Sequence, residues 1–334
     1  MPRLTTLDEV LFPVGEHPVF VSVAEDDGEQ RVSVPWKKAV VDGNTRRVLG
    51  IVGRDYRLVK NREALDMAHE CCRAVFPETK PAEWEAQAVD APATAAYCHI
   101  DLVHKFNTLD FTFAPEAERP DVFGPFIRVT NSYNGLRALG FDIGFYRKIC
   151  KNGMIAPDSL IRFKFTHSRS DIRKSIQFQV AGERLTKFKT AFADSLASLR
   201  NCAVPRSQFE PLIRSALLLQ PPQRLRPDDP ETDDWWILSA QLAKISTRYA
   251  SELGENAYAA FNAITEFASH PPDNRCLHRD RHSLQRLAGS WVSSFSAACH
   301  TKGFSINDYI EKLEEKRVGI TENESGASVR SVHA

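Results

Sequence analysis

The alternation of apolar and polar residues divides this chain into two halves. In the first half, short segments alternate with a period of two, which is typical of strands that bury one face. The clearest examples lie at residues 19–23 and 30–36, which are expected to form a hairpin, and at residues 139–150 and 160–167. Lys151, Asn152 and Gly153 are expected to form a tight turn after the third of these segments. From residue 170 onward, apolar residues recur every three to four positions, as they do in amphipathic helices. We therefore expect an α+β fold in which an antiparallel, strand-rich N-terminal half is followed by a helical C-terminal half.

Breaks in these patterns predict three segments. Residues 1–204 are expected to form a strand-rich α+β domain with a basic sheet and one long helix, and Pro205 marks the end of this domain. Residues 205–317 are expected to form a helical domain. Residues 318–334 are rich in Ser, Glu and Gly, a composition that favours a disordered tail.

Composition narrows the class of protein. A chain of 334 residues with 43% hydrophobic and 26% charged residues is an ordinary globular sequence. Every apolar run is far shorter than the ~20 residues of a membrane helix, and the N-terminus lacks the features of a secretory signal. The seven cysteines are odd in number and irregularly spaced, which fits a reducing compartment. We therefore expect a cytoplasmic protein that does not contact a membrane.

The net charge is zero, but the charges are unevenly distributed along the chain. Residues 1–127 contain 14 Lys/Arg and 21 Asp/Glu, whereas residues 128–189 contain 13 and 4. Residues 190–334 contain 16 and 18. The middle segment therefore has an excess of nine positive charges, and a local excess of this kind attracts anionic partners.

The basic residues of the middle segment are interleaved with aromatic residues. Such a surface suits single-stranded nucleic acid, because cations follow the phosphates and rings stack on the bases. The simpler alternative is that these charges form the solvated face of a sheet and a helix, and that the Asn and Ser residues satisfy their own turn. The predicted nucleic-acid contacts are Arg128, Asn131, Tyr133, Arg137, Tyr146, Arg147, Lys148, Lys151, Arg162, Lys164, Arg169, Arg173 and Lys174.

Motifs for catalysis are missing from the sequence. It contains no GxSxG, HExxH, GxxxxGK[ST] or strand-linked GxGxxG motif, so we expect neither catalytic residues nor a nucleotide cofactor. Its carboxylates are not paired as in metal-dependent nucleases, and no metal is expected. Two groups have metal-ligand residue types without the paired spacing of a zinc site: Cys98, His99 and His104, and Cys276, His278 and His282.

Five segments of the sequence form an ordered set of motifs. They are residues 49–61 (LGIVGRDYRLVKN), 131–135 (NSYNG), 146–154 (YRKICKNGM), 165–168 (FTHS) and 262–270 (NAITEFASH). In this order they resemble motifs of the phage/plasmid-like family known as domain of unknown function 932, and the resemblance spans most of residues 49–291. Ser168 and Arg169 stand where the family usually has Thr-Gly. The resemblance implies a phage, prophage or plasmid setting and brings no established activity.

Three functional hypotheses arise from these observations. A hairpin sheet followed by a long basic helix is similar to the core of single-strand annealing proteins, which form rings that hold DNA in a basic groove. The first hypothesis is thus an ATP-independent, homo-oligomeric protein that binds or anneals single-stranded DNA, with RNA as an open alternative. The second is a protein-binding regulatory or anti-restriction factor of a mobile element without nucleic-acid activity. The third, ranked last, is an enzyme with a site around His104, His167 or His270.

Overall fold

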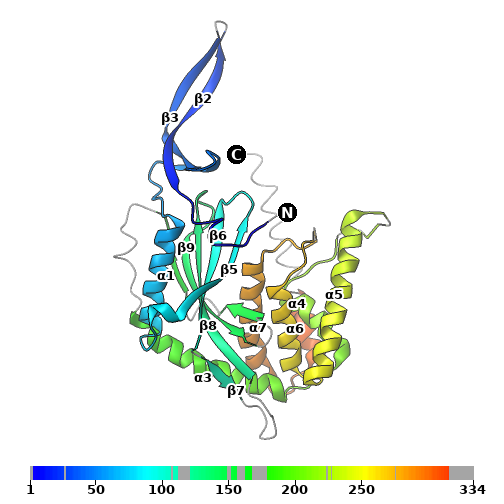
Figure 1. Cartoon of the computed structure of the whole chain (residues 1–334). Coiled ribbons are helices and arrows are strands. Elements are labelled where there is room, and N and C mark those ends of the chain that lie inside the picture. Colours follow the sequence, from blue (N-terminus) through cyan, green and yellow to red (C-terminus); the bar gives the residue numbers. More distant parts are fainter. Residues whose placement is uncertain are drawn as a thin grey trace. The chain divides into compact units, whose positions relative to one another are not determined.

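The structure is a computed structural model of the whole chain, and it confirms the α+β class (Figure 1). Its contacts divide the chain into two compact units, which we describe separately. Unit 1 comprises Met1–Thr108, Gly124–Gly144 and Asp158–Thr186, and unit 2 comprises Leu109–Phe123, Phe145–Pro157 and Lys187–Ala334. The structure describes residues 3–25, 28–106, 108–111, 121–148, 152–155, 162–167, 179–222, 225–226, 228–274 and 276–315.

The two units alternate along the chain, because strands β8 and β9 each begin in one unit and end in the other. The sequence instead suggested successive domains that meet at residue 204. That boundary stays a prediction, and the expected tail at residues 318–334 lies outside the described residues.

Unit 1 contains most of an antiparallel sheet with the strand order β1-β5-β6-β8-β9, and β11 pairs with β9. Helix α1 contacts β6 and buries its small apolar face there. Alternation alone places Ile100 and Leu102 towards one side of β6, and both are buried. The elements are β1 (Arg3–Leu4), α1 (Asn61–Val75), the short helix η1 (Pro81–Glu83), β5 (Trp84–Pro92), β6 (Tyr97–His104), β8 (Asp121–Ser132), β9 (Leu139–Arg147) and β11 (Arg162–Phe165).

A second sheet of unit 1 contains β2 (Val14–Glu25), β3 (Gly28–Asp42) and β4 (Val48–Gly53). The predicted hairpin is confirmed, although its strands are longer than the pattern indicated. One face of its base packs into a core with Val14, Val40 and Tyr133. Beyond β4, β2 and β3 continue as a two-stranded arm (Figure 1).

Unit 2 is mainly helical and has an aromatic core. Phe123 at the end of its part of β8 packs edge-on against Phe192 and stacks against Phe261. Phe145 of β9 stacks on the same Phe192, with ring centroids 5.5 Å apart. The elements are β7 (Leu109–Phe111), β10 (Asn152–Ile155), α3 (Gln179–Asn201), η2 (Arg206–Gln208), α4 (Phe209–Ala216), α5 (Pro230–Leu253), α6 (Ala257–Ser269) and α7 (Arg281–Cys299), and residues 306–315 are also helical.

Two strands differ from the sequence-based expectation. Strand β5 has a weak alternation of small residues and was not anticipated. Asn152 and Gly153 were expected in a tight turn, but they belong to β10, which is completely buried. Their turn-forming composition is overridden because Gly153 donates its N–H to Ser269 Oγ at 2.7 Å. Within the part of the chain that the structure describes, no helix has the length and hydropathy needed to cross a membrane.

Candidate functional site

Three of the five family-like segments converge in unit 1. Asn131 at the end of β8 donates to Asn61 Oδ1 and to the carbonyl of Val59, both at 2.8 Å. The hydroxyl of Tyr133 accepts the N–H of Asn61 at 3.0 Å, and Asn61 in turn donates to Val10. These asparagines are buried, so their amides fix the start of α1 against the end of β8.

Tyr56 and His167 form a stacked aromatic pair beside this network. Their ring centroids are 4.6 Å apart and their planes are inclined by 19°. The Tyr56 hydroxyl donates to the carbonyl of Ser132 at 2.5 Å, and burial raises the pKa of this phenol to about 12. The Nδ1–H of His167 donates to the carbonyl of Arg57 at 3.0 Å. Both rings are therefore held in place and half-buried.

The protonation state of His167 follows from this environment. Burial lowers the pKa of the imidazole below its ordinary value, and its hydrogen bond to Arg57 opposes this shift only in part. The ring is therefore neutral at pH 7. Its Nε2 atom is buried and has no hydrogen-bond partner among the described residues.

Close packing explains the glycines of these segments. A Cβ atom on Gly50 would lie 2.4 Å from the Cα atom of Asn134, so β4 can approach the turn after β8 only with glycine there. Gly135 has a φ of +74° and lies against the ring of Tyr56. Glycine adopts this left-handed conformation without steric cost. The turn after β8 therefore packs directly against the stacked pair of Tyr56 and His167.

Exposed cations lie close in the sequence to the two residues of the stacked pair. Arg57 exchanges two hydrogen bonds with His167, since its N–H also donates to the carbonyl of His167 at 3.3 Å. Lys164 precedes His167 by three residues at the end of β11. The side chains of Arg54, Arg57 and Lys164 are all exposed. This part of unit 1 therefore combines fixed aromatic rings with accessible positive charge.

A row of polar residues crosses the neighbouring strands β6 and β8. Asp101 and Arg128 are opposite each other in the register and form a bidentate ion pair, with N···O distances of 2.5 and 2.6 Å. Next to them, His99 Nδ1 lies 2.8 Å from Thr130 Oγ1. All four side chains are almost completely inaccessible to water. The guanidinium of Arg128 is consequently neutralised inside the protein.

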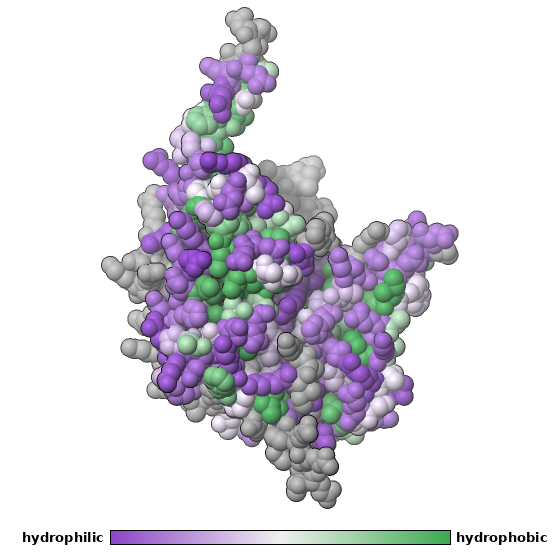
Figure 2. Space-filling view, in the orientation of Figure 1, coloured by the Kyte–Doolittle hydropathy of each residue, from purple (hydrophilic) through white to green (hydrophobic). Residues whose placement is uncertain are grey.

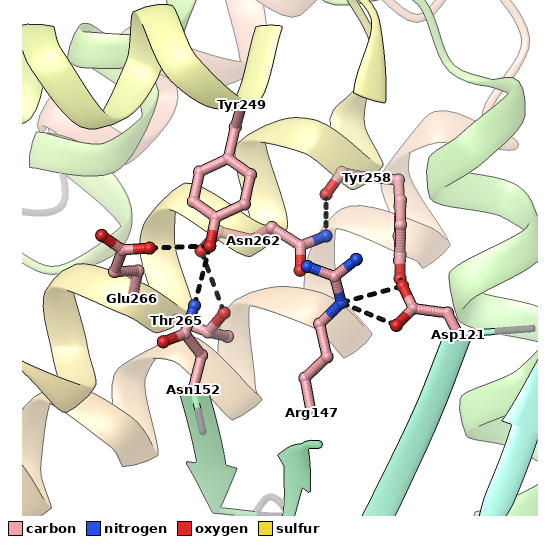
Figure 3. A network of polar contacts seen from close by, with 8 residues as sticks. All are labelled: Asp121, Arg147, Asn152, Tyr249, Tyr258, Asn262, Thr265 and Glu266. Atoms are coloured by element: carbon pink, nitrogen blue, oxygen red, sulfur yellow. Dashed lines mark hydrogen bonds and ion pairs between the residues drawn. The ribbon is translucent and has the colours of Figure 1, made fainter. Parts of the chain in front are cut away.

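The other two family-like segments converge in unit 2, where they form a polar network (Figure 3). Arg147 Nε contacts Asp121 Oδ1 at 2.7 Å, and the Tyr258 hydroxyl donates to the same carboxylate. Asn152 donates to the Tyr249 hydroxyl at 2.9 Å, and that hydroxyl donates to Glu266 at 2.7 Å. The network ties β9 and β10 to helices α5 and α6.

The chemistry of this network is structural. The carboxylate of Asp121 already accepts from a guanidinium and a phenol, and Glu266 accepts from Tyr249 and from Arg248. Burial, together with the charge of Asp121, raises the pKa of Tyr258. The network thus stabilises the junction of these strands and helices.

The predicted nucleic-acid contacts in unit 1 differ in their exposure to water. Arg128, Asn131 and Tyr133 were expected on the surface, and this was wrong: they are buried with the partners described above. Arg137 is half-buried and covers the ring of Tyr97 at 4.2 Å. Lys164 is exposed. Arg162 belongs to β11 opposite Asp142, and its side chain lies outside the described residues.

The other predicted contacts also separate into groups. Tyr146 and Arg147 are buried, contrary to expectation, because Tyr146 accepts a hydrogen bond from Arg281 at 3.1 Å and Arg147 pairs with Asp121. Lys148 is exposed. The remaining four lie outside the described residues: Lys151, Arg169, Arg173 and Lys174.

These outcomes have a common cause. The carboxylates that neutralise Arg128 and Arg147 come from residues 101 and 121, outside the basic segment of the sequence. Local charge counting therefore overestimated the exposed positive charge. It also missed Tyr56 and Arg57, whose pairing with His167 spans 110 residues. Their only sequence signal was their position inside the family-like segment at residues 49–61.

Comparison with known proteins places the chain in one family. No curated protein and no solved structure matches it, so the likeness to single-strand annealing cores stays a prediction. A family model matches residues 48–291, close to the span of the five segments. This chain therefore belongs to the family described as Domain of unknown function (DUF932).

Proposed function

We propose that this protein binds single-stranded nucleic acid through unit 1, without ATP. The observation that carries the proposal is the stacked pair of Tyr56 and His167, together with the exposed residues Arg57, which is hydrogen-bonded to His167, and Lys164, three residues before it. Proteins that hold single strands combine these two elements, since rings stack on bases and cations follow phosphates. We take DNA as the ligand, and RNA is the alternative that the same chemistry admits.

The aromatic rings and the cations of this surface are each expected to make a separate, measurable contribution to the free energy of binding. Stacking of one base on an aromatic side chain contributes about 1–3 kcal/mol. Each neutralised phosphate releases counterions and steepens the salt dependence by about 0.7 in log–log slope for a single strand. Because Arg128 and Arg147 are internal, we expect a small number of phosphate contacts and a moderate salt slope.

Fluorescence anisotropy with a labelled single-stranded oligonucleotide tests the charge term. Lys164→Ala is expected to weaken binding several-fold and to lower the salt slope, because it removes one exposed cation of unit 1. Lys244→Ala is the matched control, since Lys244 is exposed on α5 in unit 2. Equal affinities for the two variants, or no binding by the natural chain at low salt, would contradict the proposal.

The stacking term is tested at Tyr56. Tyr56→Phe keeps the ring and loses only the hydrogen bond to Ser132, so it is expected to retain most of the binding. Tyr56→Leu removes the ring and is expected to weaken binding about tenfold. Circular dichroism of both variants shows whether the fold is retained. If folded Tyr56→Leu binds as the natural chain does, this ring is no stacking platform.

Further parts of the proposal concern the cellular role. We propose strand annealing by a homo-oligomer in the cytoplasm, during DNA recombination by a phage, prophage or plasmid. An assay that follows the pairing of two complementary labelled strands measures annealing directly. Binding without acceleration of pairing would limit the function to strand binding.

A second candidate function is protein binding by a regulatory or anti-restriction factor of a mobile element. The observation that favours it is the exposed apolar surface of the β2–β3 arm, where large hydrophobic residues are accessible to water. This function predicts a partner protein that copurifies with the chain at high salt and is released by polar substitutions on the arm. A chain that copurifies with no other protein and binds single strands would favour the first candidate.

A further inference from the structure

The β2–β3–β4 sheet has one face on the core and one face towards water. In the register, Val21 is opposite Val32, and Val23 lies two residues further along the same face. Towards the base, His17 is opposite Ala39, which is opposite Ile51 of β4. A register shift between Val40 and Val41 pairs Val41 with Val48, which brings Val48 onto this face as well. We call the resulting set the apolar stripe: Val21, Val23, Val32, Val48 and Ile51.

The members of the apolar stripe are all accessible, with exposed fractions between 44% and 55%. Figure 2 shows hydrophobic residues in green along the arm below its tip. A two-stranded ribbon without a covering layer is marginally stable in water. Covering the apolar stripe would therefore stabilise the arm. An exposed apolar surface of this kind is typical of a site that binds another protein surface.

The edges of the arm oppose the addition of a further strand. Pro18 in β2 and Pro35 in β3 lack the N–H that a continuous ladder requires, and the register of the pair shifts beside Pro18. A partner that extended the sheet from either edge would meet these interruptions. Packing of another surface onto the face of the arm avoids them.

The charges of the arm are complementary from one end to the other. Residues 25–29 carry four carboxylates in the sequence, and among the described residues Glu29, near the start of β3, is exposed. At the base, Lys37 and Arg54 are exposed, and the N–H of Arg54 donates to the carbonyl of Trp36. Eight residues separate Glu29 from Lys37, about 26 Å in extended chain, so they attract each other little within one arm.

We propose that the partner is a second copy of this chain, packed arm against arm across a two-fold axis. An antiparallel arrangement covers both apolar stripes at once and places Glu29 of each arm near Lys37 of the other. A two-fold interface satisfies this requirement with a single surface, because each contact occurs twice. The inference does not depend on nucleic-acid binding, and its test uses the protein alone.

The size of the stripe sets the strength of this association. About nine residues of strand give a face roughly 30 Å long and about 10 Å wide, or about 300 Å² per copy. A standard interface buries about 800 Å² per partner, so the arms alone form a weak dimer. Dimerisation is therefore expected to depend on concentration.

Sedimentation velocity of the full chain over a range of concentrations measures the association. The natural chain is expected to shift from monomer to dimer, and the double variant Val21→Ser/Val32→Ser is expected to remain monomeric. The control is Ile237→Ser, which replaces a similarly exposed apolar residue on α5 of unit 2. A monomeric natural chain at every concentration, or a control that loses the dimer as completely as the double variant, would overturn the proposal.

A charge exchange tests the antiparallel arrangement even if serine substitutions disturb the arm. Glu29→Lys and Lys37→Glu are each expected to weaken the dimer at low salt. Their combination is expected to restore it, because the reversed charges again face each other across the two-fold axis. A combined variant that associates no better than either single variant would reject this arrangement. Dissociation of the restored dimer in 0.5 M salt would support the antiparallel arrangement.

Discussion

Asp101 and Arg128 carry opposite charges at a position almost closed to water. A buried pair of this kind contributes little net stability, but removing one partner leaves the other charged and unsolvated. The Asp121–Arg147 pair and the Asn61–Asn131 pair are also buried, so the loss of either partner would leave a polar group without its hydrogen bond. Each of these polar side chains can be buried because it is hydrogen-bonded to a partner from a distant part of the chain.

We expect Asp101→Ala to lower the free energy of unfolding by about 3–5 kcal/mol, because Arg128 would lose its carboxylate. Replacing both residues together, as Asp101→Leu/Arg128→Met, is expected to recover much of that loss. Urea unfolding followed by circular dichroism provides the measurement. A single variant within about 1 kcal/mol of the natural chain would show that water reaches Arg128.

The stability of the protein is expected to fall as the pH decreases below about 6.5. The folded state holds the pKa of His167 below its ordinary value, so the unfolded chain binds the proton first and acid favours unfolding. This contribution is present above pH 6.5 and is lost between that value and the lowered pKa. His167→Asn is expected to flatten the decrease in urea midpoint, and His69, whose pKa is also lowered by burial, accounts for part of the remainder. An unchanged pH profile in the variant would argue against a buried neutral His167.

At the scale of elements, the backbone of β4 lies very close to the turn that follows β8. Gly50 leaves no room for a Cβ atom, whereas a Cβ atom on Gly53 in the same strand would meet nothing within 4 Å. The family-like segment at residues 49–61 contains both glycines, and sequence alone gives no means of ranking them. The structure assigns the packing role to Gly50.

This pair provides a matched experiment. Gly50→Ala is expected to lower the free energy of unfolding by about 1–3 kcal/mol, because the backbone of Asn134 must move to admit the methyl group. Gly53→Ala is expected to change it by less than about 0.5 kcal/mol. Thermal unfolding of both variants makes the comparison, and equal losses would contradict the close contact between β4 and the turn.

At the scale of the whole molecule, strands β8 and β9 each serve two units. Phe123 and Asp121 belong to the strand-rich half of the sequence, yet they pack against Phe261 and Tyr258 of α6. Successive segments of the chain are therefore not independent in their packing. Alternating connections of this kind make the fold rich in contacts between distant residues.

A fragment of residues 1–204 tests this interdependence. Without α6, the ring of Phe123 loses Phe261, and the Asp121–Arg147 pair loses the hydroxyl of Tyr258. We expect the fragment to lack a cooperative thermal transition and to be cleaved rapidly by protease, unlike the full chain. A fragment that unfolds cooperatively would instead support a domain boundary at residue 204.

The sequence by itself determined the class of the fold, the first hairpin, most helices and the family. These follow from periodicity and from short segments, which depend on residues that are close in the chain. The tertiary structure alone decided which charges are exposed, because Asp101 and Asp121 reach Arg128 and Arg147 from outside the basic segment. It also brought Tyr56 to His167 and uncovered the apolar stripe. Pairing across a sheet joins residues that are far apart in the sequence, and burial depends on which surfaces those pairings cover.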